Sequence, residues 1–392
     1  MSNHLSRRNW LKKSLVSTGG LIAGISTVSH AGGFTSFGMK PVYANGLLDH
    51  SDLPVQDRSL LKARLTSNEN PFGPSKKTIA AIAESAARGN RYPMDAGRKM
   101  IETLATKEGV AQEQIIMAAG SSDILEKTAF MLCAKGGNVI SADPSYMSLV
   151  KSATALGATW KNIPLRSDYA HDLAAMEKAV DADTKLVYIC NPNNPTGTLT
   201  PIEDLRAFCK RVSAKVPVFV DEAYLELLDD HDKQSTVGLI QEGHDIIVCR
   251  TFSKIHGMAG LRMGYAVAKK ERIESLQGAG RPGMGLSVTT LEGAMASLAD
   301  IEFQNYSRTN NKINRDYTMQ ELKKANLQPI PSFTNFILFP IEMPTRVLVD
   351  AMMKMGVGMR GFDINGKPFG RVSIGTMDEM KLFSKCLAET LS

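Results

Sequence analysis

Short apolar runs, each followed by a cluster of polar residues, recur along this 392-residue chain and constrain its fold more than any other feature. Segments with helical periodicity, such as Asp123–Leu132 and Ile202–Val212, lie between these runs. Strands that alternate with helices are typical of an α/β protein with a mostly parallel central sheet. Two later runs, Asn335–Phe339 and Arg371–Gly375, predict strands of a second, smaller α/β domain. The predicted strands of the central sheet are Gln114–Ala118, Asn138–Ala142, Lys185–Cys190, Val218–Asp221, Ile246–Arg250 and Gly264–Ala268.

The polar clusters lie where the apolar runs end. In open α/β sheets, ligands bind in the crevice outside the carboxyl ends of the strands, so these clusters are expected to converge on one site. The clusters are Ala119–Asp123, Asp143–Tyr146, Asn191–Gly197, Asp221–Tyr224 and Arg250–Tyr265.

Lys254 lies in the last of these clusters, with Ser253 before it and Arg262 after it. A lysine can form a Schiff base with an aldehyde cofactor, while a hydroxyl and a guanidinium can hold an anionic group on that cofactor. A Ser-Lys pair alone indicates little, because most lysines are solvated surface charges. The order and spacing of Asn191–Gly197, Asp221–Tyr224 and the lysine cluster carry more information. With these motifs the chain resembles the fold-type I pyridoxal phosphate (PLP) aminotransferases, and within them the histidinol-phosphate aminotransferase branch.

The resemblance covers residues 60–392 and implies roles for four residues of these motifs. Lys254 matches the lysine that carries the cofactor and moves the substrate Cα proton. Asp221 matches the aspartate that keeps the pyridine nitrogen protonated, so that the ring can take up negative charge. Tyr224 and Asn194 match the side chains that form hydrogen bonds to the phenolic oxygen of the cofactor.

A glycine followed by two hydroxyl residues at the start of a helix is typical of an anion site. The exposed amide groups and the helix dipole favour negative charge there. By resemblance, Gly120, Ser121 and Ser122 bind the cofactor phosphate, and Ser253 and Arg262 complete the phosphate site.

Two tyrosines match aromatic residues of the family. Tyr146 corresponds to the residue that stacks on the pyridine ring. Tyr92 corresponds to a tyrosine that reaches the phosphate site of the neighbouring subunit. The resemblance therefore implies a homodimer in which Tyr92 crosses to the partner site.

Three residues are candidates for substrate binding. Arg371 matches the arginine that binds the α-carboxylate or the substrate phosphate, and Arg360 is a second candidate. Asn70 lies in Leu65–Gly73, which resembles the substrate-side loop of the family. The segment Pro282–Ser287 departs from the family pattern, since the expected aromatic residue and asparagine are missing. This difference bears on the substrate and not on the cofactor.

The N-terminus has the features of an export signal. Paired arginines in Ser6–Lys13 precede a glycine-broken apolar stretch, Leu15–Val28, and small residues that predict cleavage after Ala44. This order resembles a twin-arginine signal, which implies the twin-arginine export machinery as a partner and a periplasmic or exported location. A basic tail and a retained N-terminal anchor are the alternatives, although the stretch is short for a membrane span.

Four segments are predicted from these patterns, with the two parts of the small domain flanking the large one in sequence. They are a signal peptide over 1–44, an N-terminal arm with part of the small domain over 45–70, a large PLP-binding domain over 71–285 and a small C-terminal domain over 286–392.

The composition argues against several function classes. Five of the 46 basic residues and none of the 40 acidic residues lie in residues 1–44, so the rest is nearly neutral and a nucleic-acid partner is not indicated. The five cysteines show no C-x-x-C spacing and the seven histidines show no metal-ligand spacing. Neither a disulfide framework nor a metal site is predicted.

The implied reaction is transamination, in ping-pong order, between a 2-oxo acid and an amino acid or an amino-alcohol phosphate such as histidinol phosphate. A PLP-dependent decarboxylase or lyase of the same fold stays open, because the sequence does not show which Cα bond lies perpendicular to the ring. A non-catalytic PLP- or amino-acid-binding protein is a further alternative, against which the intact set of motif residues argues. A Rossmann dehydrogenase is not indicated, since no G-x-G-x-x-G follows the first strand.

Overall fold

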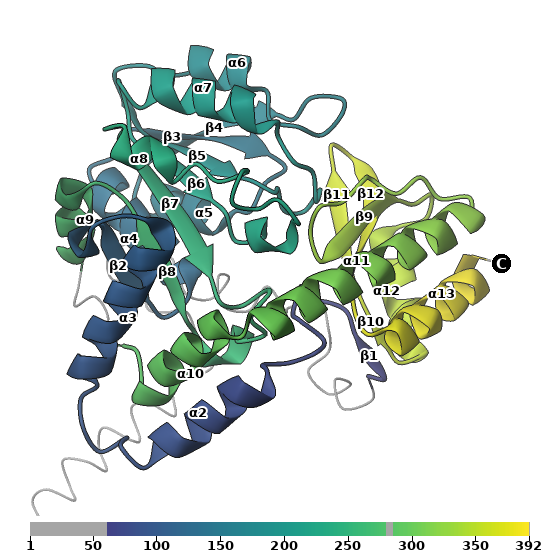
Figure 1. Ribbon diagram of the computed structural model, residues 1–392. Helices are drawn as coiled ribbons and strands as arrows, with labels where there is room; N and C mark the ends of the chain where they lie inside the picture. The colour runs from purple at the N-terminus through teal and green to yellow at the C-terminus, as the bar shows by residue number, and fades with distance from the viewer. Residues whose placement is uncertain (1–60, 280–284, 392) are drawn as a thin grey trace, which may run out of the picture. The chain divides into compact units, whose positions relative to one another are not determined.

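A seven-stranded sheet forms the centre of the larger part of the chain (Figure 1). The computed structural model describes residues 61–279 and 285–391. The strand order is β2-β8-β7-β6-β5-β3-β4, and every neighbouring pair is parallel except the two pairs made by β8. The predicted mostly parallel sheet of an α/β protein is therefore confirmed. Its strands are β2 (Ile115–Ala118), β3 (Asn138–Asp143), β4 (Thr159–Pro164), β5 (Thr184–Cys190), β6 (Val218–Asp221), β7 (Ile246–Thr251) and β8 (Gly264–Val267).

Helices cover both faces of this sheet (Figure 1). They are α3 (Met94–Glu108), α4 (Ser121–Cys133), α5 (Ser148–Ala155), α6 (Leu173–Lys178), α7 (Ile202–Val212), α8 (Gly238–Gln241), α9 (Lys270–Gln277) and α10 (Val288–Ala299). Helix α2 (Lys76–Ala86) packs against α10. Three short 3-10 helices lie at Gln112–Gln114, Leu225–Leu227 and Ala259–Leu261.

The side chains of each strand alternate between two hydrophobic cores. In β6, Val218 and Val220 pack in the core beneath α3, α7 and α10, while Phe219 packs in the core beneath α4, α5 and α9. Both faces of a parallel sheet are buried in this way, which explains why the strands read as continuous apolar runs. The carboxyl ends of the strands are left free to carry polar residues.

Helix α7 illustrates why the helical periodicity predicted these elements. Its buried residues recur at helical spacing, its first turn is acidic and its last turn is basic, which complements the helix dipole. Pro201 precedes the first helical residue, where a missing N–H costs least. The structure gives this helix the predicted bounds, Ile202–Val212.

A second group of elements, mostly from the C-terminal part, has its own core. It contains an antiparallel sheet of order β11-β12-β9 and a parallel pair, β1-β10. Because β1 pairs with β10, the residues that precede the large sheet in sequence share a hydrophobic core with the C-terminal helices. This core contains Leu65, Phe339 and Phe383. These elements are β1 (Ala63–Arg64), α11 (Ile301–Lys324), β9 (Phe336–Pro340), α12 (Thr345–Lys354), β10 (Val357–Gly358), β11 (Arg360–Ile364), β12 (Lys367–Ser373) and α13 (Met377–Leu391).

Several sequence predictions lie outside the described residues or remain predictions. The signal peptide over 1–44, most of the arm over 45–70 and the first residues of Pro282–Ser287 are not described, and the domain boundaries stay predictions. No helix within residues 61–279 and 285–391 is long and apolar enough to cross a membrane. All five cysteines are buried, with free thiols.

Candidate active site

Asp221 ends β6 and is buried at the carboxyl edge of the sheet, with 2% of its surface exposed. The Ala223 N–H donates to its Oδ1 at 3.1 Å, and the Tyr188 hydroxyl donates to its Oδ2 at 3.2 Å. Burial outweighs these donors and raises the pKa of Asp221 to about 6. A buried carboxylate in this position is stabilised when a cation, such as a protonated ring nitrogen, lies beside it.

Lys254 follows β7, the neighbour of β6 in the sheet. Its Nζ donates to the backbone carbonyl of Asn68 at 2.9 Å and lies 5.2 Å from the centroid of the Tyr224 ring. Burial, together with the nearby Arg371 guanidinium, lowers the pKa of Lys254 to about 8. A neutral amine, which a nucleophile and a base both require, is therefore accessible near neutral pH.

The Tyr224 hydroxyl receives two side-chain amide donors. Asn194 Nδ2 lies at 3.3 Å and Asn68 Nδ2 at 3.1 Å. Arg371 Nη1 donates to Asn194 Oδ1 at 2.8 Å, which orients the Asn194 amide with its nitrogen toward Tyr224. Burial raises the pKa of Tyr224, so the hydroxyl is protonated at neutral pH.

The start of α4 forms an anion-binding corner. Gly120 precedes this helix with φ +93°, and a Cβ there would lie 2.2 Å from Arg262 Nη2, so only glycine lets the guanidinium approach. Arg262 Nη1 donates to Ser253 Oγ at 3.5 Å. A Cβ at Gly264 would lie 2.5 Å from the Ser121 nitrogen. The structure therefore brings the predicted phosphate residues from three segments of the chain to one place.

The two predicted tyrosines lie in different environments. Tyr146 is hydrogen-bonded to the Ser122 side chain, and its burial raises the pKa of its hydroxyl. The nearby charge of Asp221 also raises the pKa of Tyr146, so Tyr146 and Ser122 both border the site. Tyr92 is 79% exposed, just before α3, and is not part of this buried group.

Arg371 is buried and fixed from several sides. Its guanidinium carbon lies 5.1 Å from the ring centroids of both Phe336 and Phe362, and its Nη2 donates to the Thr66 carbonyl at 3.1 Å. The guanidinium carbon of Arg360 lies 5.4 Å from the same Phe362 ring. The two predicted substrate arginines thus share one aromatic neighbour, and they make this side of the site suitable for anionic groups.

The side chain of Asn70, a predicted substrate residue, forms hydrogen bonds that hold the segment next to Lys254 in place. Its Nδ2 donates to the Ile255 carbonyl at 2.9 Å and to Ser307 Oγ at 3.1 Å, while its Oδ1 accepts from the Phe72 N–H at 3.0 Å. Asn70 also lines a small cavity that Lys254 borders. Its side-chain bonds stabilise the segment after the lysine.

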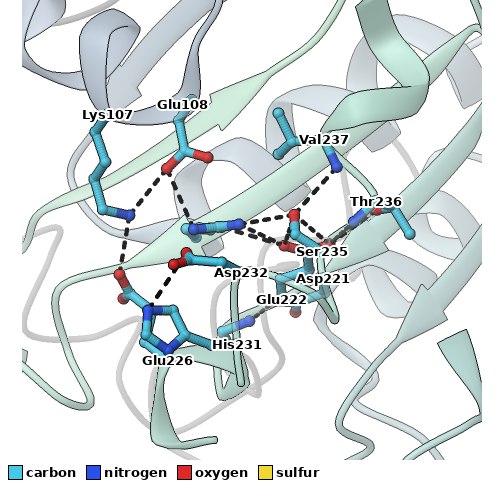
Figure 2. Close-up of polar contacts among 12 residues, drawn as sticks. Lys107, Glu108, Asp221, Glu222, Glu226, His231, Asp232, Ser235, Thr236 and Val237 are labelled. Carbon is cyan, nitrogen blue, oxygen red and sulfur yellow. Dashed lines mark hydrogen bonds and ion pairs between the residues drawn. The ribbon is translucent and has the colours of Figure 1, made fainter. Parts of the chain in front are cut away.

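A buried ion-pair network centred on Arg250 and Glu222 holds the ends of β6 and β7 (Figure 2). Arg250 at the end of β7 donates to Glu222 Oε2 through Nε at 3.2 Å and Nη2 at 3.0 Å. Its Nη1 donates to Glu108 at 3.2 Å, and Lys107 links Glu108 to Glu226. Figure 2 shows that the Glu222 carboxylate also accepts hydrogen bonds from the Ser235 hydroxyl and the Thr236 N–H. Since Glu222 follows Asp221, the network locks β6 and β7 together where Asp221 and Lys254 emerge.

Three residues of the site were not singled out from the sequence. Asn68 contacts both Lys254 and Tyr224, Ser373 contacts Asn68, and Tyr188 contacts Asp221. Asn68 lies in the loop that resembles the family's substrate side. The loop could therefore be recognised from the sequence, but the role of Asn68 within it could not. Tyr188 reads as a strand residue, and only the register of β5 against β6 places it near Asp221.

The arrangement fits PLP. The glycine at position 120 lets the Arg262 guanidinium lie against the start of α4, and the donors gathered there suit a phosphate. Asp221 could pair with a pyridine nitrogen, Tyr224 and Asn194 could bind a ring oxygen, and Lys254 offers an amine to an aldehyde.

Comparisons with known proteins agree with this geometry. Residues 62–385 match the family described as aminotransferase class I and II. A histidinol-phosphate aminotransferase of Moorella thermoacetica is 35% identical over 331 residues, which cover 84% of this chain and 85% of the relative. A second, from Cupriavidus pinatubonensis, is 36% identical over 333 residues, with 84% and 88% covered.

Among solved structures, the histidinol-phosphate aminotransferase of Sinorhizobium meliloti, crystallised with pyridoxal-5'-phosphate, superposes with a TM-score of 0.80 at 25% identity. The match covers 92% of this chain and 99% of that one. The fold, the family match and the relatives lead to one conclusion: the chain belongs to the class I and II aminotransferases and is a PLP-dependent aminotransferase.

Proposed function

We propose that Lys254, Asp221 and Tyr224 carry out the chemistry of this aminotransferase. The observation that carries the proposal is their convergence at neighbouring strand ends, with the Lys254 amine above the Tyr224 ring and Asp221 buried beside them. The remaining residues proposed to hold the cofactor are Gly120, Ser121, Ser122, Tyr146, Asn194, Ser253 and Arg262.

Each residue has a defined task in this proposal. When bound, PLP supplies an aldehyde that captures amino groups and a ring that takes up negative charge. Lys254, whose amine has a lowered pKa, accepts the substrate Cα proton and later returns it. Asp221 keeps a proton on the ring nitrogen, and Tyr224, oriented by Asn194, donates to the phenolic oxygen. Arg371 binds the substrate carboxylate or phosphate.

The substrates are an amino donor and a 2-oxo acid, and we propose that the donor carries a phosphate, as histidinol phosphate does. Two observations support this substrate. Arg371 and Arg360 provide two cations on one side of the site, and both relatives described above are histidinol-phosphate aminotransferases.

A panel of amino donors tests the substrate. Purified protein loaded with PLP is mixed with histidinol phosphate, glutamate, aspartate and aromatic amino acids, and its visible absorbance is followed. Histidinol phosphate and glutamate are expected to convert the cofactor to its amine form, and a 2-oxo acid to reverse the change. If other donors convert the cofactor and histidinol phosphate does not, the phosphate substrate is rejected. Release of CO₂ would identify a decarboxylase.

We propose a homodimer, the state typical of this family, with Tyr92 reaching the phosphate site of the partner. The 79% exposure of Tyr92 in a single chain supports this arrangement. Mixing Tyr92→Ala chains with Lys254→Ala chains tests it, because a mixed dimer would contain one site with both residues. About one quarter of the sites, and of the activity, should be restored. No recovery in a mixture shown to contain mixed dimers would place Tyr92 in its own subunit's site.

We also propose that residues 1–44 direct export through the twin-arginine machinery, with a periplasmic or exported product cleaved after Ala44. The paired arginines Arg7 and Arg8, before a weakly apolar stretch, support this. Replacing both with lysine should leave the precursor in the cytoplasm, while the unaltered chain is exported. Cell fractionation followed by N-terminal sequencing measures this. Equal export of both forms would reject the signal.

A further inference from the structure

Asn68 lies in the loop after β1 and is buried, with 3% of its surface exposed. Its backbone is left-handed, with φ +53°, a conformation that asparagine tolerates better than most residues but that still needs support from its surroundings. Ser373, at the end of β12, provides that support. Its Oγ accepts from the Asn68 N–H at 2.8 Å and donates to Asn68 Oδ1 at 2.8 Å.

This conformation presents two faces of Asn68 to the site. The backbone carbonyl accepts hydrogen bonds from Lys254 Nζ and from Asn335 Nδ2, both at 2.9 Å. The side-chain Nδ2 donates to the Tyr224 hydroxyl at 3.1 Å. One residue therefore contacts both the amine and the hydroxyl, and a hydroxyl from another strand fixes its orientation.

We infer that Asn68 is a positioning residue that, held by Ser373, sets the free Lys254 amine and the Tyr224 hydroxyl in their relative places. The inference rests on the roles proposed for Lys254 and Tyr224. It adds that Ser373, at the end of β12, acts on the reacting amine through Asn68 and not through direct contact.

The physical consequence concerns the protonation of the amine. A fixed carbonyl acceptor stabilises the ammonium form of Lys254, so loosening it favours the neutral form. The side-chain bond to Tyr224 acts in parallel, because it keeps the hydroxyl aimed at a constant position. A merely structural role for Asn68 would change the stability of the protein but not the titration of Lys254.

The test measures that titration in protein free of cofactor. The rate of Lys254 acylation by acetic anhydride is followed by mass spectrometry across a pH series. Asn68→Gly keeps a backbone that accepts positive φ and removes the side chain, while Ser373→Ala leaves Asn68 intact. Each variant is expected to lower the midpoint by about half a pH unit. After loading with PLP, each is expected to lose about tenfold in kcat with little change in KM.

The double variant separates positioning from independent effects. If Ser373 acts through Asn68, the double variant should shift the midpoint no further than Asn68→Gly alone. Asn326→Gly is the matched control, because Asn326 is also left-handed, at φ +59°, but exposed. It should leave the midpoint and kcat unchanged.

Two results would overturn the inference: unchanged midpoints in both single variants, or additive shifts in the double variant. If Asn68→Gly fails to fold, Ser373→Ala alone decides, because it leaves the loop sequence intact. The proposed role of Lys254 is checked separately, by protection of Lys254 from acylation when PLP is added to the unaltered protein. Loss of that protection would reject the lysine's role, whereas the midpoint shifts concern Asn68.

Discussion

Replacing Lys254 with alanine is expected to lower kcat by about 10⁴-fold, because one change removes both the amine that meets the cofactor and the base that moves the Cα proton. The buried position of the amine and its pKa of about 8 suit both tasks. The visible absorbance of the lysine-bound cofactor should disappear together with turnover. Steady-state kinetics and an absorbance spectrum of the purified variant measure the two losses.

A small amine provides a sharper check of the same prediction. The alanine variant lacks the lysine side chain, and added methylamine should restore part of the proton transfer, with a rate that rises with the free-base concentration. Lys270→Ala is the matched control, since Lys270 is an exposed lysine at the start of α9 and should behave as the unaltered protein. Turnover by Lys254→Ala at the normal rate would contradict the mechanism.

The sequence predicted the central sheet well because its strands are buried on both faces. Val218–Asp221 has the predicted bounds, and the other five predicted strands differ by one residue at an end. The strand β4 was missed for the opposite reason. It lies at the sheet edge, its residues are exposed or half-buried, and it lacks an apolar run.

The small-domain strand β12 was predicted too late in the chain. Its first half contains Lys367, Pro368 and Gly370, residues that carry no local strand signal. Pairing with β9 on one side and β11 on the other extends the strand back to Lys367. Tertiary pairing decided what local propensity could not.

The candidate site was predictable where its residues form motifs, and not where they meet across long sequence distances. The segments around Asp221, Asn194 and Lys254 follow apolar strands and could be read directly. The contacts of Asn68 with Tyr224, Lys254 and Ser373 join residues 156 to 305 positions apart. No periodicity encodes such contacts, and only the fold brings them together.

The substitution Asp221→Asn is expected to have opposite effects on catalysis and on the stability of the cofactor-free protein. Turnover should fall by at least about 10²-fold, because a neutral amide cannot keep the ring nitrogen protonated. Stability should increase, because burial makes the carboxylate unfavourable in the folded state. The amide still offers an acceptor to the Ala223 N–H and can donate to the Tyr188 hydroxyl, so its polar atoms keep partners.

The direction of the stability change follows from the pKa. Folding raises the pKa of Asp221 from 3.8 to about 6, so between these values the folded state binds more protons than the unfolded state. The cofactor-free protein should therefore lose stability from this group as the pH rises from about 4 to 6, and the full cost persists above that range. Two pKa units correspond to roughly 3 kcal/mol, an upper limit for the gain in Asp221→Asn near pH 7.

Urea unfolding of the cofactor-free proteins at pH 4 and pH 7.5 measures this effect. The difference in unfolding free energy between Asp221→Asn and the unaltered protein should be present at pH 7.5 and nearly vanish at pH 4. Asp230→Asn, at an exposed aspartate, should show no such difference. With PLP bound, the order should reverse, since a protonated ring nitrogen stabilises the carboxylate and not the amide. A variant less stable than the unaltered protein at pH 7.5 without cofactor would show that the Asp221 carboxylate is satisfied by the protein alone.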